Sequence, residues 1–222
     1  VCGVKGYDEA KTEFNIKAKI VVDAGGRNSI SLRRLNLKKD IFGQGKIALA
    51  AHWDNVDTPA NYCYMHISQP GYTGIAPVGH RRANVVLVLN TACLNGANVD
   101  SYYRRIVLKN KLRREILNTG RLIEKVRIIN SLVYSVKAQQ CGGLLLVGDA
   151  TGFIDPFTGE GIYLSLRSSQ LASDVIKKAF DRSDFSKDQL GLYNQKRRKE
   201  FKEKIILSKI LQRLIYSPSL CV

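Results

Sequence analysis

Several common features are missing from this sequence. No run of about 18 apolar residues occurs, so a membrane-spanning helix is excluded. The cysteines are odd in number, widely spaced and never arranged as C-x-x-C, and they are Cys2, Cys63, Cys93, Cys141 and Cys221. That spacing indicates neither a zinc site nor a disulfide framework, so we expect no metal site and reduced thiols. Reduced thiols are typical of a cytoplasmic protein, which is the location we expect.

Signatures of catalysis by side chains are also lacking. The sequence shows neither a Ser-His-Asp set nor paired carboxylates, so nothing in it indicates a hydrolase. It also identifies no catalytic side chain. No G-x-G-x-x-G follows a predicted strand, so the usual phosphate-binding turn of a dinucleotide-binding fold is absent from these residues.

The charge is strongly positive. The 222 residues include 35 Lys and Arg but only 19 Asp and Glu, which gives a net charge of +16. The cations are spread along the chain, with the densest cluster at Lys196 to Lys199, and no nucleic-acid-binding motif accompanies them, so we expect no nucleic-acid partner. A solvated basic face is the favoured interpretation, and peripheral attraction to an anionic membrane surface is the functional alternative.

The most informative stretch runs from Leu144 to Ile162. Four apolar residues end at Gly148-Asp149, glycines and a proline follow at high density, and a helix is predicted from about Gly161. This is a strand, glycine loop and helix. Such a unit presents backbone N–H groups and the positive end of a helix dipole to a ligand. A carboxylate at the end of the strand can accept hydrogen bonds from ligand hydroxyls.

The run GDATGFIDPFTGEGI resembles the second flavin-binding motif of the FAD-dependent oxidoreductases related to p-hydroxybenzoate hydroxylase, most closely the geranylgeranyl reductase branch. The resemblance implies that Asp149 binds the ribitol chain of FAD. It also implies that Pro156 to Ile162 lie along the isoalloxazine ring, with N–H groups near Gly161 and Ile162 facing its N1 and O2 edge. The cofactor-binding residues implied by this motif are Gly148, Asp149, Gly152, Pro156, Gly159, Glu160, Gly161 and Ile162. Asp155 and Glu160 are interpreted as ordering the loop, with proton transfer as the less favoured alternative.

A second motif occurs earlier, where a predicted strand from Phe14 to Val22 runs into Asp23-Ala-Gly-Gly-Arg-Asn-Ser29. It resembles the middle fingerprint of the same family, which passes near the FAD pyrophosphate. The further cofactor-binding residues that it implies are Asp23, Gly26, Arg27 and Ser29. Gly25 stands where the family usually has an aspartate, so the handling of a nicotinamide cofactor does not carry over directly.

Between the two motifs, short alternating runs separated by turn residues predict an antiparallel sheet over 46–53, 62–67, 72–78 and 83–90. Helical spacing follows over 99–117, and two long helices are predicted at about 161–180 and 188–214.

The fold class expected is α+β or α/β. The chain would form part of a Rossmann-like FAD-binding domain, with an inserted antiparallel substrate domain and C-terminal helices. The domain boundaries expected are FAD-binding segments at 1–40 and 138–180, a substrate domain at 41–137 and a helical segment at 181–222.

These residues and the resemblance predict a FAD-dependent reductase or dehydrogenase for an apolar, isoprenoid-type substrate, with NAD(P)H or another electron donor. A flavin monooxygenase is the runner-up, and a basic remnant or binding module without catalysis is the third interpretation. Halogenases of the superfamily are disfavoured because they tend to carry a different sequence after the loop proline, where this chain has Thr158 to Gly161. Because the G-x-G-x-x-G region is absent, we expect these residues to be a fragment that binds FAD poorly by itself.

Overall fold

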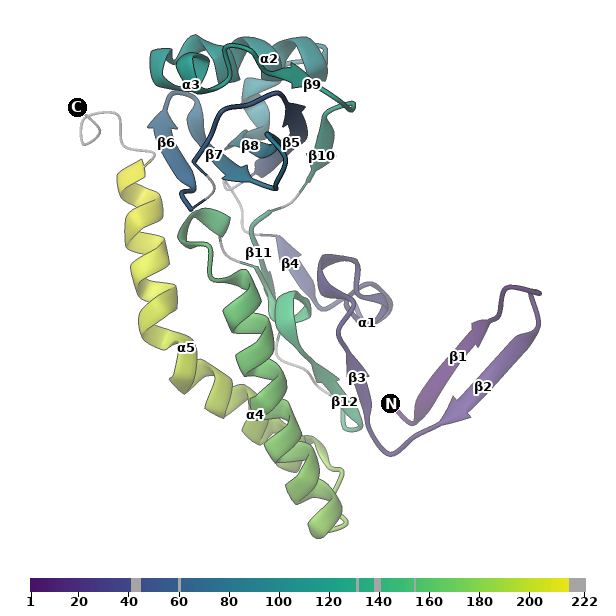
Figure 1. Ribbon diagram of the computed structural model, residues 1–222. Helices are drawn as coiled ribbons and strands as arrows, with labels where there is room; N and C mark the ends of the chain where they lie inside the picture. Colours follow the sequence, from purple (N-terminus) through teal and green to yellow (C-terminus); the bar gives the residue numbers. More distant parts are fainter. Residues whose placement is uncertain (41–44, 60, 131, 138–140, 154, 216–222) are drawn as a thin grey trace. The chain divides into compact units, whose positions relative to one another are not determined.

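The computed structural model describes residues 1–40, 45–59, 61–130, 132–137, 141–153 and 155–215 (Figure 1). Contacts divide the chain into two compact units. Unit 1 contains Val1–Asp40 and Tyr134–Lys209, and unit 2 contains the described parts of Ile41–Val133 and Ile210–Val222. The chain therefore leaves the first unit and returns to it.

Unit 2 is built on an antiparallel sheet in the order β10-β5-β8-β7-β6, with β9 pairing to β5. Its strands are β5 (Lys46–Asp54), β6 (Tyr64–Ser68), β7 (Gly71–Pro77), β8 (Ala83–Asn90), β9 (Arg121–Leu122) and β10 (Arg127–Ile129). The alternation in sequence becomes two faces of the sheet, because successive side chains of a strand point to opposite sides. One face carries Ile47, Leu49 and Trp53 of β5 into the core of unit 2. The predicted antiparallel sheet is confirmed.

Two helices contribute to that core, α2 (Val99–Lys109) and α3 (Lys111–Ile116). The sequence predicted one helical stretch over 99–117, but the structure divides it at Asn110. That residue has an extended backbone, and its side chain accepts a hydrogen bond from the backbone N–H of Arg113 at 3.2 Å. Asparagine is a preferred N-cap, so it begins a new helix here in place of continuing the first.

The described residues of unit 1 form three separate strand pairs. They are the hairpin β1 (Gly3–Tyr7) with β2 (Glu13–Lys17), the parallel pair β3 (Val21–Asp23) with β12 (Leu144–Leu146), and the antiparallel pair β4 (Lys38–Asp40) with β11 (Tyr134–Val136). The predicted single strand over 14–22 is thus wrong. It is split between β2 and β3, which pair with different partners, and β2 is exposed along its whole length.

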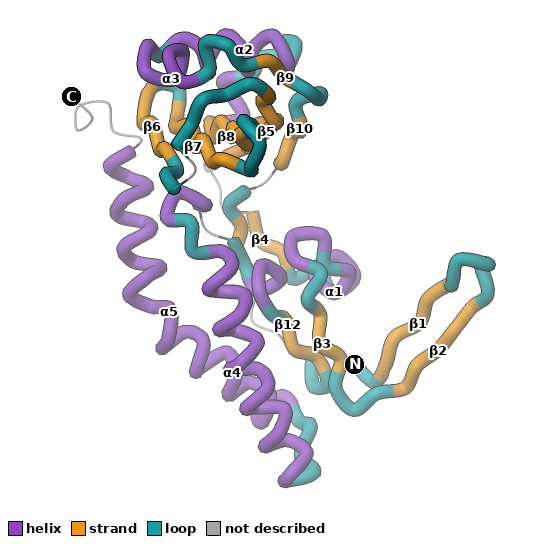
Figure 2. The backbone as a smooth tube through the Cα atoms, in the orientation of Figure 1, coloured by secondary structure: helices purple, strands orange, loops and turns teal. Residues whose placement is uncertain are grey.

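The α-helices of unit 1 are α1 (Ile30–Arg34), α4 (Gly161–Asp181) and most of α5 (Lys187–Ile215) (Figure 2). The last six residues of α5 group with unit 2. Both long helices predicted from the sequence are confirmed. Leu171 and Val175 of α4 pack with Leu190 and Tyr193 of α5 over Leu145 of β12. Within the described residues, no helix has the length and apolarity needed to cross a membrane.

Candidate functional site

The two glycine motifs meet at one edge of unit 1. Strands β3 and β12 run parallel, with Asp23 opposite Leu146, so their carboxyl ends lie together. Residues 24–29 follow the first strand, and a short 3₁₀ helix, Gly148–Thr151, follows the second. A Cβ atom built on Gly26 would lie 3.9 Å from the Cβ of Asp149. Ligand sites are typical of this position at the carboxyl ends of parallel strands.

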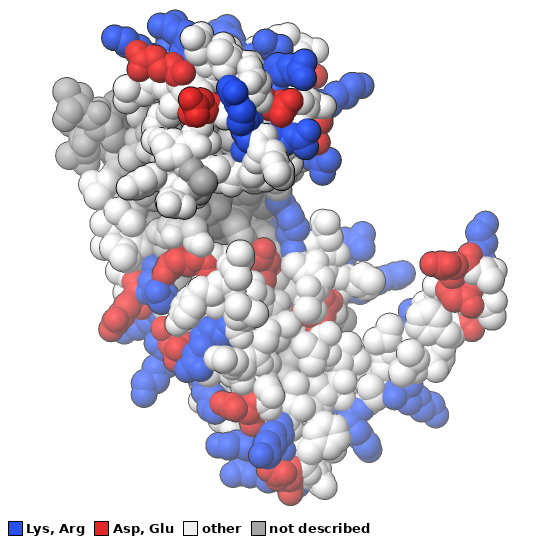
Figure 3. All heavy atoms as spheres, viewed as in Figure 1, with Lys and Arg blue, Asp and Glu red and all other residues white. Residues whose placement is uncertain are grey.

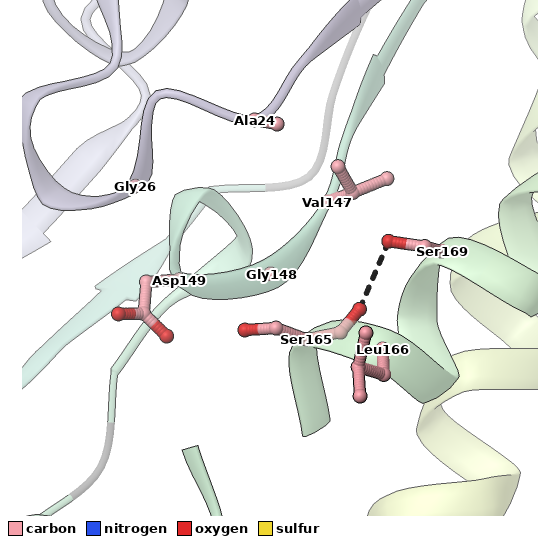
Figure 4. A pocket seen from close by; sticks show the side chains of 8 residues that line it. All are labelled: Ala24, Gly26, Val147, Gly148, Asp149, Ser165, Leu166 and Ser169. Carbon is pink, nitrogen blue, oxygen red and sulfur yellow. Dashed lines mark hydrogen bonds between the residues drawn. The ribbon is translucent and has the colours of Figure 1, made fainter. Parts of the chain in front are cut away.

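An open cavity of about 220 Å³ lies at this meeting point (Figure 4). Its lining residues come from the turn after β3, from the residues that follow β12 and from the first three turns of α4, and they are Ala24, Gly26, Val147, Gly148, Asp149, Ser165, Leu166 and Ser169. The sequence predicted three of these residues, Gly26, Gly148 and Asp149. The others carry no signal of a ligand, except that small side chains on α4 indicate close packing.

Gly148 has a backbone conformation that a side chain would strain. Its φ angle is +57°, and a Cβ atom there would lie 3.1 Å from the Oγ of Ser165. Its backbone N–H donates to the Oγ of Ser168 at 2.9 Å, and that hydroxyl donates to the carbonyl of Ser165 at 2.8 Å. The serines of α4 therefore hold the end of β12 close to the helix, which agrees with the close approach expected from the small side chains on this helix.

The carboxyl of Asp149 is partly buried and lies near the guanidinium of Arg27. Burial raises the pKa of its carboxyl above the ordinary value, and the Arg27 guanidinium partly offsets that rise. The Tyr134 hydroxyl donates to the backbone carbonyl of Asp149 at 2.5 Å. Arg27 and Asp149, predicted from different motifs, are thus brought into electrostatic contact.

Asp23 and Ser29 have a different surrounding. Ser29 is fully buried, and its hydroxyl donates to Asp23 at 2.7 Å. The same carboxylate accepts hydrogen bonds from the backbone N–H groups of Gly25 and Ser31. These two side chains hold the turn together, and the turn presents Gly26 and Arg27.

The second part of the predicted loop leads into α4. Asp155 is buried and accepts a hydrogen bond from the N–H of Phe157 at 3.1 Å, which caps a short 3₁₀ helix, Pro156–Thr158. The predicted loop-ordering role of Asp155 is thus confirmed. Gly159 ends that helix in the left-handed region at φ +68°, and Gly152 likewise has φ +115°.

Glu160 immediately precedes α4, and the amino end of the helix is open. Ile162 is 79% exposed, and a Cβ atom on Gly161 would meet no heavy atom within 4 Å. The Glu160 side chain makes no capping hydrogen bond to the first turn. The helix therefore directs N–H groups and the positive end of its dipole outward, an arrangement that stabilises an anion.

Comparison with known proteins places these features in a family. The squalene epoxidase family model matches residues 83–219. A digeranylgeranylglycerophospholipid reductase of Thermoplasma volcanium is 31% identical over 199 residues, which cover 85% of this chain and 48% of the relative. A 1H-pyrrole-2-carbonyl-[peptidyl-carrier protein] chlorinase of Pseudomonas fluorescens is 32% identical over 200 residues, covering 82% of this chain and 43% of that protein.

Among solved structures, a geranylgeranyl bacteriochlorophyll reductase-like protein of Thermoplasma acidophilum has a TM-score of 0.81 at 25% identity. The match covers 99% of this chain and 56% of that one. The chain thus spans about half the length of the relatives it matches. The resemblance to the geranylgeranyl reductase branch and the predicted fold class are both confirmed. The chain belongs to the squalene epoxidase family, within the superfamily of FAD-dependent oxidoreductases.

Proposed function

We propose that this chain forms the flavin-contacting part and the substrate-side sheet of a FAD-dependent reductase for an apolar, isoprenoid-type substrate. The observation that carries the proposal is the convergence of Gly26, Gly148 and Asp149 on one cavity beside α4. The flavin would supply the redox chemistry, and the chain would bind and orient it. Several relatives are named as reductases of a geranylgeranyl lipid, which supports the substrate class.

The residues present fit a flavin cofactor. Gly26 and Gly148 both have positive φ angles, so backbone without a Cβ lines the cavity where a ligand chain would approach. The Asp149 side chain projects from the same loop (Figure 4). Its carboxylate would accept hydrogen bonds from the ribitol hydroxyls. The open amino end of α4 would stabilise negative charge on the reduced ring.

The sheet of unit 2 offers a surface suited to an apolar substrate. The face opposite the core carries small residues in register, with Ala50 paired to Val86 and Val86 paired to Gly74. On the edge strand β6, Met65 and Ile67 are 43% and 42% exposed. An apolar substrate chain that covered these side chains would gain about 25 cal/mol of binding free energy per Å² of apolar surface removed from water.

The test is the visible absorption spectrum of protein expressed from the full natural reading frame. We expect the two-banded spectrum of oxidised flavin, with loss of most bound flavin in D149A. The matched control is D174A, which removes an exposed carboxylate of α4 and should retain the cofactor.

A colourless, well-folded wild type would contradict the proposal and favour a binding module. Retention of flavin by D149A would refute the role of Asp149 in binding the cofactor but would leave the proposed function standing. Oxygen consumption coupled to an apolar substrate would favour a monooxygenase over a reductase.

We also propose peripheral contact with anionic lipid through α5. Lys and Arg are interspersed with Asp and Glu over the face shown in Figure 3, so charge alone does not support the contact. The support comes from exposed apolar side chains along the carboxyl half of the helix, with Lys202 and Lys209 also exposed there. The apolar residues are Ile206, Leu207, Ile210 and Leu214, exposed by 47%, 55%, 50% and 42%.

Cosedimentation with vesicles tests this contact. We expect binding to phosphatidylserine-containing vesicles that weakens with salt, and loss of that binding in the I206Q/I210Q variant. L112Q alters an exposed leucine of α3 and should bind as the wild type does. Equal binding by the two variants would refute a contact through α5.

A further inference from the structure

Glu160 occupies an unusual position for an acidic residue next to a helix. It directly precedes the first residue of α4, yet its side chain makes no capping hydrogen bond to the first turn. Its carboxylate instead lies 2.5 Å from the Nζ of Lys204, 44 residues later on α5. Acidic side chains at helix amino ends normally accept hydrogen bonds from the first N–H groups and interact with the dipole. Here the lysine holds the carboxylate.

A second contact places the same lysine firmly. Lys204 Nζ lies 4.8 Å from the centre of the Tyr163 ring, on the first turn of α4. The ammonium group therefore interacts with both the carboxylate and an aromatic ring of the helix start. The hydrogen bond to Glu160 raises the pKa of Lys204 above its ordinary value, so the lysine stays charged at neutral pH.

A neighbouring ion pair of opposite polarity fixes the alignment of the two helices. Arg167 of α4 donates to Glu200 of α5 at 2.7 Å. Glu200 lies one turn before Lys204 on α5, and Arg167 lies two turns after Glu160 along α4. A shift of one helix along the other would place like charges together. The two ion pairs together thus favour the alignment in which Lys204 of α5 lies beside Glu160, at the end of the loop that precedes α4.

We infer that Lys204 is a positioning residue for the flavin site, holding the Glu160 carboxylate against α5 so that the amino end of α4 stays open to an anionic ligand. The inference rests on the proposed function and adds a residue that neither glycine motif contains. Without the lysine, Glu160 would be free to turn toward the N–H groups of Gly161 and Ile162. It would then compete with the reduced flavin for those groups and repel its negative charge.

The midpoint potential of the bound flavin tests this role. In protein from the full natural reading frame, we expect K204M to weaken binding of reduced relative to oxidised flavin about tenfold, a downward shift of about 30 mV for a two-electron couple. K204R keeps the cation and should retain the wild-type potential. The double variant K204M/E160Q should return toward the wild-type potential, because the side chain at position 160 is then an uncharged amide and does not repel the reduced flavin.

The double variant separates this mechanism from the alternatives. If Lys204 acted only by packing, the potential would stay low in K204M/E160Q. If it acted through its own charge on the flavin, E160Q would raise the potential equally with and without the lysine, whereas we expect a clear rise only in K204M. K202M removes an exposed lysine of the same helix and controls for general loss of charge. An unchanged potential in K204M with flavin bound would overturn the inference and leave the proposed function intact. A wild type without flavin would overturn both.

Discussion

The carboxylate of Asp23 accepts hydrogen bonds from the backbone N–H groups of Gly25 and Ser31 and from the Ser29 hydroxyl, so it joins the turn after β3 to the start of α1. Ser29 in turn accepts from the N–H of Leu32 at 3.0 Å and so begins α1. The resemblance implied that Asp23 and Ser29 bind the cofactor. Their observed partners lie within the protein, which supports a role in shaping the turn around Gly26.

We expect D23A to lower the free energy of unfolding by about 1–3 kcal/mol at neutral pH, because the buried Ser29 hydroxyl and the partly buried N–H of Ser31 lose a charged acceptor. Burial opposes ionisation of Asp23, but the hydrogen bonds from Ser31, Gly25 and Ser29 outweigh it, and its pKa lies below 3.8. A lowered folded pKa contributes stability above the unfolded value that is lost as the pH falls through the folded one. Urea unfolding at several pH values from 7 to 3 measures the difference.

The loss caused by D23A should therefore shrink toward the acidic end of that range. The control D174A removes an exposed carboxylate of α4 and should change stability little at any pH. A D23A deficit that is the same at pH 7 and pH 3 would contradict the hydrogen-bonded, ionised Asp23.

Helix α2 is joined to the sheet of unit 2 by one buried chain of hydrogen bonds. The indole N–H of Trp53 on β5 donates to the Tyr103 hydroxyl at 3.1 Å, and that hydroxyl donates to the carbonyl of Val85 on β8 at 2.8 Å. Both aromatic side chains are almost fully buried. Burial raises the pKa of Tyr103, so the hydroxyl remains protonated and can donate.

We expect Y103F to destabilise the protein by about 1–3 kcal/mol, because the buried indole N–H loses its acceptor. Y62F alters a tyrosine that is 66% exposed and serves as the matched control, with a change within about 0.5 kcal/mol. Chemical denaturation followed by tryptophan fluorescence reports directly on the single Trp53. Equal stability of the two variants would show that this chain of bonds contributes nothing.

The division of α2 from α3 shows why element boundaries escape local patterns. Arg113 is 1% exposed and donates to the carbonyls of Ile106 and Val107 near the end of α2, and to Ser68 of β6. Arg114 beside it is exposed. Cations near helix carboxyl ends are favourable in general. The sequence pattern does not distinguish which of two adjacent arginines will be buried.

For the molecule as a whole, the relatives are about twice as long as this chain. Among the described residues, the parallel sheet of unit 1 consists of two strands only. We therefore expect the 222-residue chain by itself to release FAD during desalting, whereas protein from the full natural reading frame retains it. The ratio of flavin to protein after gel filtration is the measurement. Equal retention by both would show that the ADP half of the cofactor needs no further site.

Local patterns determined much of this protein. Alternating side chains predicted the sheet of unit 2, apolar spacing predicted α4 and α5, and glycine density predicted the loop after Gly148, because each depends on residues close in sequence. The resemblance of that loop to a known flavin-binding motif implied the FAD-dependent superfamily.

Tertiary structure alone decided which distant groups meet. It placed Gly26 beside Asp149, Ser168 on the N–H of Gly148, and Lys204 on Glu160. It also divided 14–22 into two strands, because β2 pairs with β1 and β3 pairs with β12. Contacts between residues far apart in sequence depend on how packed elements align, and no local periodicity encodes that alignment.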